Sequence, residues 1–208
     1  MTVQDVVDMA KHGELKQLSL ADEDDVILSF INLGILELYK RFEIETEEVI
    51  IQLGIATIVS DQYQMISNTI YEMPNDYMYI ICAHEEDGSD ISINEESDLL
   101  TINTVGWNRI QIPTPTKSAY ISIIYASEPS VLNSSNLTDR IKLPPQLIEA
   151  LLHYVGYRGH GSIDGSINTE NNTHYQRFEK SCNKVKADGT FNYGGLSTMS
   201  RFKSSGMV

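Results

Sequence analysis

The chain has 208 residues, 29 of them acidic and 15 basic, and a formal net charge of −14 at pH 7. A chain of this length can bury a core without a disulfide or a metal, and it forms one domain or one core with a smaller companion. The acidity argues against a general nucleic-acid binder, because phosphate binding needs a basic surface.

The charge is unevenly distributed. Residues 1–138 hold 23 acidic and 6 basic residues, a net charge of −17, whereas residues 139–208 hold 6 acidic and 9 basic residues, a net charge of +3. Such asymmetry indicates different partners for the two parts. The N-terminus lacks the regions of a signal peptide and no apolar run is long enough to cross a bilayer, so we expect no membrane partner.

Two helices are predicted before residue 43. Thr2 with Asp5 forms a capping-box pattern, which predicts a helix over Val3–His12 that Gly13 ends. A second helix over Asp22–Arg41 begins with acidic and ends with basic residues, as the helix dipole favours. It is apolar on nearly every side, so it is either central or packed against a neighbouring subunit. The residues assigned to subunit packing are Val26, Phe30, Leu33 and Leu36.

The pattern then changes to strands. Short β-branched and aromatic segments alternate with turn residues and predict strands at Met65–Tyr71, Tyr77–Cys82, Ile91–Ile93, Leu99–Thr104, Arg109–Ile112 and Tyr120–Ala126. Val49–Leu53 fits a helix or a strand. The regular spacing predicts a meander, in an antiparallel sheet or a small sandwich. The acidic segment Glu85–Asp98 lacks EF-hand spacing, which favours a solvated loop over a weak calcium site.

Helices return after Pro144 and Pro145, which predict a third helix to Arg158. Gly159–Ser166 is predicted to be a loop, and a fourth helix over Thr169–Ala187 completes an αα-hairpin. Residues 188–208 show no helical or strand period and contain no acid after Asp188. They hold side chains suited to ordering on a partner, namely Phe191, Tyr193, Leu196, Met199, Arg201, Phe202 and Lys203.

Residue patterns typical of catalysis are weak. The five histidines form no HxxxH pair on a helix, the two cysteines lie a hundred residues apart, and no nucleophile elbow occurs. His153 and His160 could approach His174 across the hairpin, which a small hydrolase would require, but the pattern favours separate surface or loop histidines. We expect no enzyme, no cofactor and no metal.

Four segments taken in order are informative: Asp24–Phe42 (DDVILSFINLGILELYKRF), Tyr71–Tyr77 (YEMPNDY), Leu143–Arg158 (LPPQLIEALLHYVGYR) and His174–Phe178 (HYQRF). With this order of parts the chain resembles the head-to-tail adaptor proteins (connectors or gatekeepers) of tailed bacteriophages, especially short-tailed ones.

The resemblance implies an α+β fold with a helical bundle from residues 1–43 and 139–187, an inserted antiparallel β-domain at 44–138 and an extended arm at 188–208. It further implies a ring, usually of twelve copies, in the neck of a virion assembled in the host cytoplasm. The arm would dock on the portal protein, the β-domain would face the tail nozzle protein, and double-stranded DNA would pass through the acidic ring without specific binding. The alternatives are a tail-completion protein that does not dock on the portal, or a small hydrolase.

Overall fold

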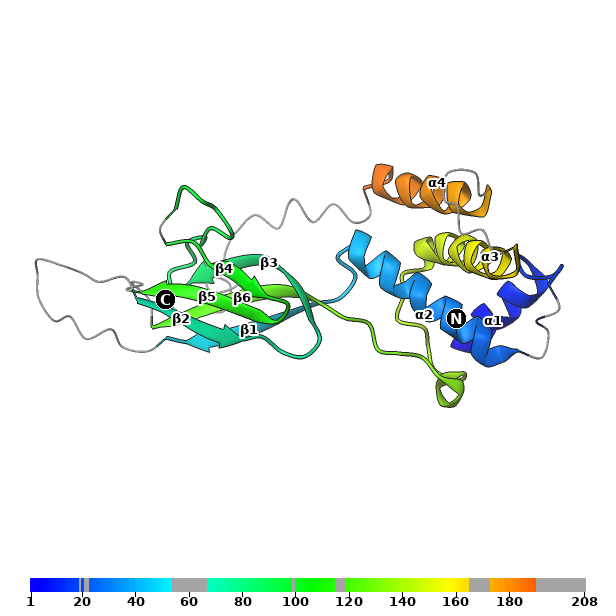
Figure 1. The fold of residues 1–208 in the computed structure, drawn as a ribbon, viewed down its shortest axis with the longest axis horizontal. Coiled ribbons are helices and arrows are strands. Elements are labelled where there is room, and N and C mark those ends of the chain that lie inside the picture. The colour runs from blue at the N-terminus through cyan, green and yellow to red at the C-terminus, as the bar shows by residue number, and fades with distance from the viewer. Residues whose placement is uncertain are drawn as a thin grey trace, which may run out of the picture. The chain divides into compact units, whose positions relative to one another are not determined.

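The structure is a computed structural model, which describes residues 1–18, 20, 23–53, 67–98, 100–114, 119–164 and 173–189. It divides into two compact units (Figure 1). The helical unit comprises the described residues of Met1–Ile44 and Pro129–Asn192, and the β unit comprises those of Glu45–Glu128. Helices and antiparallel sheets are therefore separated, and the predicted α+β class is confirmed. None of the described helices is long and apolar enough to cross a membrane.

The N-terminal helices follow local sequence signals. Helix α1 spans Val3–His12, and its predicted capping box is present. The Asp5 amide donates to Thr2 Oγ1 at 3.2 Å, and the Thr2 amide donates to Asp5 Oδ2 at 2.7 Å. Helix α2 spans Asp24–Arg41, with acidic residues in its first turn and basic residues in its last. It begins two residues later than predicted.

Helix α2 is covered on two sides within its own unit. One side packs on α3 so closely that a Cβ at Gly34 would lie 2.6 Å from Leu151 Cδ1. On another side, the Asn32 side chain exchanges two hydrogen bonds of 2.8 Å with the backbone of Leu132. Tyr39 Oη donates to the Lys142 carbonyl at 3.1 Å. Polar side chains that a helical projection assigns to solvent therefore hold the chain that returns from the β unit.

The predicted third helix is longer than the sequence suggests. A 3-10 turn at Pro145–Leu147 leads into α3, Ile148–Asp164, so the expected loop at Gly159–Ser166 is wrong over its first six residues. A Cβ at Gly159 would lie 2.4 Å from Leu15 Cδ2. This glycine therefore permits close packing inside the helix rather than ending it.

Helix α4, Thr173–Ala187, packs along α3. The predicted apolar stripe is confirmed, since Phe178, Cys182 and Val185 are buried. The predicted first residues of this helix, 169–172, lie outside the described residues.

The β unit contains two three-stranded antiparallel sheets in its described residues. The strands are β1 (Thr46–Gln52), β2 (Ser67–Glu72), β3 (Tyr77–Glu85), β4 (Asn103–Gly106), β5 (Arg109–Thr114) and β6 (Tyr120–Ser127). The orders are β1-β6-β3 and β2-β5-β4. The meander prediction is wrong, because β4 and β5 are the one described pair that is consecutive in the chain. Most of the pairing is non-local, which short-range spacing does not report.

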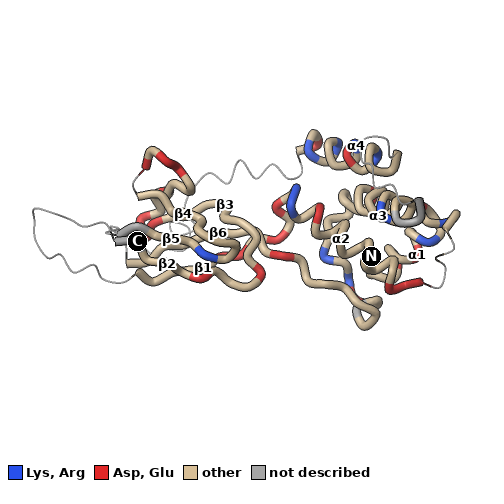
Figure 2. The backbone as a smooth tube through the Cα atoms, viewed as in Figure 1, with Lys and Arg blue, Asp and Glu red and all other residues tan. Residues whose placement is uncertain are grey.

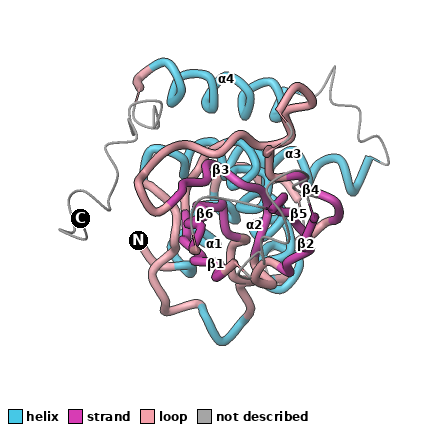
Figure 3. Tube along the Cα trace, turned by 90° about the vertical axis from the view of Figure 1, so that its left-hand side faces the viewer, coloured by secondary structure: helices cyan, strands magenta, loops and turns pink. Residues whose placement is uncertain are grey.

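The two sheets form a sandwich. Figure 3 shows β1, β6 and β3 on one side and β2, β5 and β4 on the other. Their inner faces share one apolar core, which includes Ile121, Ile123 and Tyr125 from the first sheet and Ile110 and Ile112 from the second. The residues Val49–Leu53, left open between helix and strand, fall mostly in β1, whose Ile51 belongs to this core.

The acidic segment Glu85–Asp98 is a set of turns that its own carboxylates stabilise. Asp87 Oδ1 accepts from the amide and the hydroxyl of Ser89, and Gly88 adopts a φ of 82°. Asp98 accepts from the Ser92 hydroxyl and the Leu100 amide, which lowers the pKa of its carboxyl. Among the described residues, no group of His, Cys, Asp and Glu side chains could hold a metal ion. The segment is the predicted acidic loop.

Candidate functional site

The outward side of α2 presents the first candidate interaction surface. Val26 and Leu33 are 36% and 40% exposed, and Leu36, one turn further on, is half-buried. Together with Ser29 and Lys40, these three residues are spaced alternately three and four positions apart along α2. This is the spacing of residues that face a partner helix. We call Val26, Leu33 and Leu36 the α2 stripe.

The fourth residue assigned to subunit packing differs from the other three. Phe30 is only 9% exposed, because its ring is buried inside the helical unit. Its surface available to a neighbouring subunit is therefore small, whereas the α2 stripe retains uncovered apolar area.

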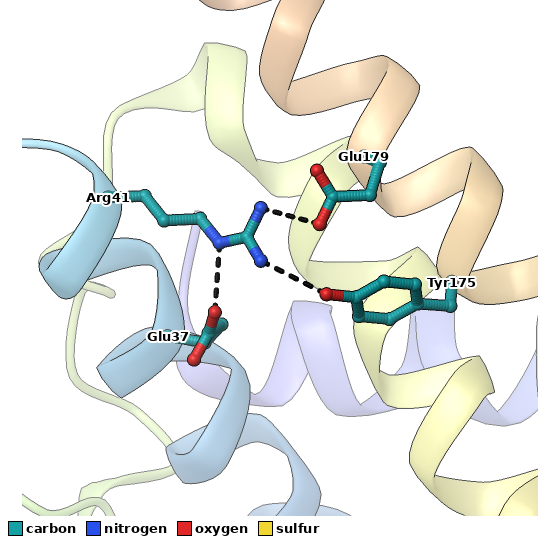
Figure 4. Close-up of polar contacts among 4 residues, drawn as sticks. All are labelled: Glu37, Arg41, Tyr175 and Glu179. Carbon is teal, nitrogen blue, oxygen red and sulfur yellow. Dashed lines mark hydrogen bonds and ion pairs between the residues drawn. The ribbon is translucent and has the colours of Figure 1, made fainter. Parts of the chain in front are cut away.

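A polar network joins the end of α2 to α4 (Figure 4). Arg41 Nε donates to Glu37 at 2.9 Å, Nη1 donates to Glu179 at 2.7 Å, and Nη2 donates to Tyr175 at 3.2 Å. The guanidinium also lies 4.7 Å from the centre of the Phe178 ring. Burial alone would lower the pKa of Arg41, but these hydrogen bonds outweigh it and raise the pKa above its ordinary value.

The network keeps a permanent charge at the α2–α4 contact. The guanidinium binds Glu37 on its own helix and Glu179 and Tyr175 on α4, so it holds these two helices together. In the sequence, Arg41 is recognisable only as a basic residue at a helix C-terminus, because Glu179 lies 138 residues away along the chain.

Three histidines meet at Glu14, in the turn after α1. His153 Nδ1 lies 3.2 Å from Glu14 Oε1, and His174 Nδ1 lies 2.8 Å from Oε2. His160 Nε2 lies 3.0 Å from the Glu14 carbonyl, and its ring stacks on that of His174 with centroids 4.7 Å apart. The favoured interpretation of separate surface or loop histidines is therefore wrong, and the approach that the sequence left open is what the structure shows. Glu14 is the residue that the sequence did not reveal.

This cluster connects Glu14 to side chains of α3 and α4. Both Nδ1 atoms lie within ion-pair distance of the one Glu14 carboxylate, and a Cβ at Gly156 would lie 2.8 Å from His174 Nδ1. Burial lowers the pKa of His174, against the opposing attraction of Glu14. The geometry therefore ties the turn after α1 to α3 and α4.

Cys182 has no features of a nucleophile. It is 1% exposed, and burial raises the pKa of its thiol to about 11. A thiol in this state is an inert core residue.

The predicted arm residues Phe191, Tyr193, Leu196, Met199, Arg201, Phe202 and Lys203 lie outside the described residues.

Charge is divided between the two units rather than between the two ends of the chain. Residues 45–128 contain 14 acidic residues and two basic ones, and Asp61 and Lys117 among them lie outside the described residues, which leaves 13 acids and Arg109 in the described part. In Figure 2, acidic positions recur along the strands and loops of the β unit, whereas the basic positions lie mostly on the helical unit. The β unit is therefore a strongly acidic surface.

Comparison with known proteins identifies the family. The model of the SU10 adaptor protein family matches residues 1–198, which includes the described residues of both units. No individual curated protein is significantly similar to the chain.

Proposed function

The chain belongs to the SU10 adaptor protein family, and we propose that it forms the ring between the portal and the tail nozzle of a short-tailed phage. Membership makes it a structural adaptor of the phage virion neck, which contacts other capsid or tail proteins, and the family is not a class of enzymes. The proposal adds the ring, its neighbours and the roles of the parts.

The observation that carries the proposal is the α2 stripe. Helix α2 already packs on α3 and on the returning chain, yet Val26 and Leu33 remain exposed on its third side. Apolar residues in a helix–helix seam call for another protein surface. In a ring, one rotation relates each copy to the next, so the neighbouring copy would cover the α2 stripe of every subunit in the same way.

The parts are assigned as follows. Residues 1–43 and 139–187 form the helical bundle of the ring, residues 44–138 form the inserted β-domain on the nozzle side, and residues 188–208 form the arm that docks on the portal protein. The absence of acids after Asp188, together with Arg201 and Lys203, suits the arm to an acidic groove. The ring holds twelve copies and assembles in the host cytoplasm.

The acidity of the chain suits a DNA channel. Residues 45–128 hold 14 acids against two bases, so a channel lined by them would repel phosphate. DNA would pass without adhering, and no specific DNA binding is expected.

The test is the mass of the purified chain, alone and with a portal ring of the same phage, measured by sedimentation or native mass spectrometry. We expect a stoichiometric ring complex. Deletion of residues 188–208 should abolish portal binding while leaving the circular dichroism of the body nearly unchanged. Leu33→Ala should leave the fold intact and reduce ring formation, and Met9→Ala, at an exposed apolar side chain of α1 outside the α2 stripe, is its matched control. A chain that never binds the portal, or a deletion that still binds it, refutes the portal assignment and favours a tail-completion protein.

A further inference from the structure

The β4–β5 hairpin exposes the only tryptophan of the chain. Its tip, Val105–Asn108, places Trp107 at the first position of a two-residue turn, where the side chain is 74% exposed, and Val105 beside it is 48% exposed. Turns of this kind favour Gly, Asn, Asp and Ser for backbone reasons. Tryptophan provides no such advantage, and its exposure removes a packing role inside the unit.

The hairpin tip is held in place from beneath. Arg109 pairs with Glu72 in the β2–β5 register, and the Met73 amide donates to the Asn108 carbonyl at 2.8 Å. Ile110, two residues after the turn residue Asn108, is 0% exposed and belongs to the sandwich core. An aromatic side chain on a fixed backbone loses little conformational freedom on binding. Trp107 therefore has the properties of a preorganised anchor.

The β unit that carries the tip is acidic, with 14 acidic and two basic residues in positions 45–128. The Thr104 amide donates to Asn94 Oδ1 at 2.8 Å, and Asn94 Nδ2 donates back to Thr104 Oγ1 at 3.2 Å. These bonds hold against β4 the loop that contains the exposed Glu95 and Glu96. The bound surface must therefore accept an indole ring and also tolerate, or attract, the acidic unit that carries it.

We infer that the hairpin tip is a docking anchor, in which Trp107 inserts into an apolar pocket rimmed by Lys and Arg on another protein of the virion neck. The inference rests on the proposed function for the setting in which the partner occurs. A second β unit is a poor occupant, because two units with 14 acids and two bases each repel one another. DNA is excluded for the same reason.

The test measures the affinity of the full chain for the purified neck proteins of the same phage, taken one at a time. Trp107→Ala should weaken binding to one of them about 30-fold, the size expected of an interface anchor. Trp107→Phe should recover part of the loss. Tyr120→Ala removes an aromatic side chain that is 44% exposed on β6 and should leave the affinity unchanged. All variants should keep the thermal midpoint of the parent chain.

A 5-fluorotryptophan label gives one 19F resonance, from Trp107, whatever tryptophans the partner contains. This resonance should lose its sensitivity to solvent isotope exchange when the partner is added. The affinity should also fall as NaCl is raised from about 0.05 M to about 0.5 M, because the salt screens the carboxylates from the basic rim.

Three outcomes overturn the inference. If Trp107→Ala binds every neck protein as well as the parent does, the anchor is wrong while the proposed function stands. If the substitution instead abolishes self-association of the chain, the occupant is a second copy. If the parent binds no neck protein at all, the proposed function fails first and the inference fails with it.

Discussion

Replacing Arg41 with methionine tests whether the α2–α4 contact depends on the charge of the guanidinium rather than on its packing. Methionine retains apolar contact with the Phe178 ring but loses the hydrogen bonds to Glu37, Glu179 and Tyr175. Glu37 and Glu179 then remain at the interface without a cation, and the Tyr175 hydroxyl no longer accepts a hydrogen bond from residue 41.

The magnitude follows from burial. A buried hydrogen bond to a charged group contributes about 1.5–3 kcal/mol, and a fully exposed ion pair contributes about 0–1 kcal/mol. The side chains of Arg41, Glu37 and Glu179 are 22%, 29% and 37% exposed, so water replaces part of each lost bond. We therefore expect a loss of about 2 kcal/mol in the free energy of unfolding for the whole network, not the sum of three buried bonds.

The assay is urea unfolding followed by far-ultraviolet circular dichroism, which reports the helical unit. A loss of this size lowers the thermal midpoint of a unit of this length by about 8–15 °C. Lys40→Met is the matched control, because Lys40 is exposed in the same helical turn. A double-mutant cycle with Glu179→Gln should show coupling of about 0.5–1.5 kcal/mol. If Arg41→Met changes stability by less than about 0.5 kcal/mol, the network is an ordinary surface contact and the reasoning is refuted.

Two further predictions concern pH and the sandwich core. Burial lowers the pKa of His174 in the folded chain, so the unfolded chain binds its proton more readily; the stability of the helical unit should be complete above about pH 6.5 and fall as the pH drops through the lower native value. His174→Gln should reduce this slope in urea titrations between pH 7 and 5, about the range in which histidine titrates, and an unchanged slope would contradict it. Ile112→Ala, at a residue that is 0% exposed in the β unit, should cost about 2–5 kcal/mol. Hydrogen exchange should then accelerate in the strands and not in α1–α4, whereas equal acceleration in both units would show that they unfold together.

Local signals in the sequence were sufficient for the helices near the N-terminus. The capping box of Thr2 and Asp5 and the charged ends of α2 act within one turn, so neighbouring residues alone determine these structures. The buried stripe of α4 was also readable, because its spacing is a property of the helix itself. The resemblance of ordered segments gave the family, which the match over residues 1–198 confirms.

Tertiary structure decided what depends on distant partners. Gly159 resembles a helix end in the sequence, but the approach of Leu15 makes it a packing position within α3. The strands pair across the chain, as β1 with β6 and β2 with β5, because the buried faces select partners that turn spacing does not identify. Glu14 gathers histidines from α3 and α4 for the same reason.

The distribution of charge depends on both the sequence and the tertiary structure. Composition alone established an acidic chain with a mildly basic final third. Only the division into units places 13 acids against one base among the described residues of a single sandwich, with an exposed tryptophan at one hairpin tip. The net charge of a segment can be counted from the sequence. The electrostatic field that a partner experiences depends on the folded surface, where strands far apart in the chain lie side by side.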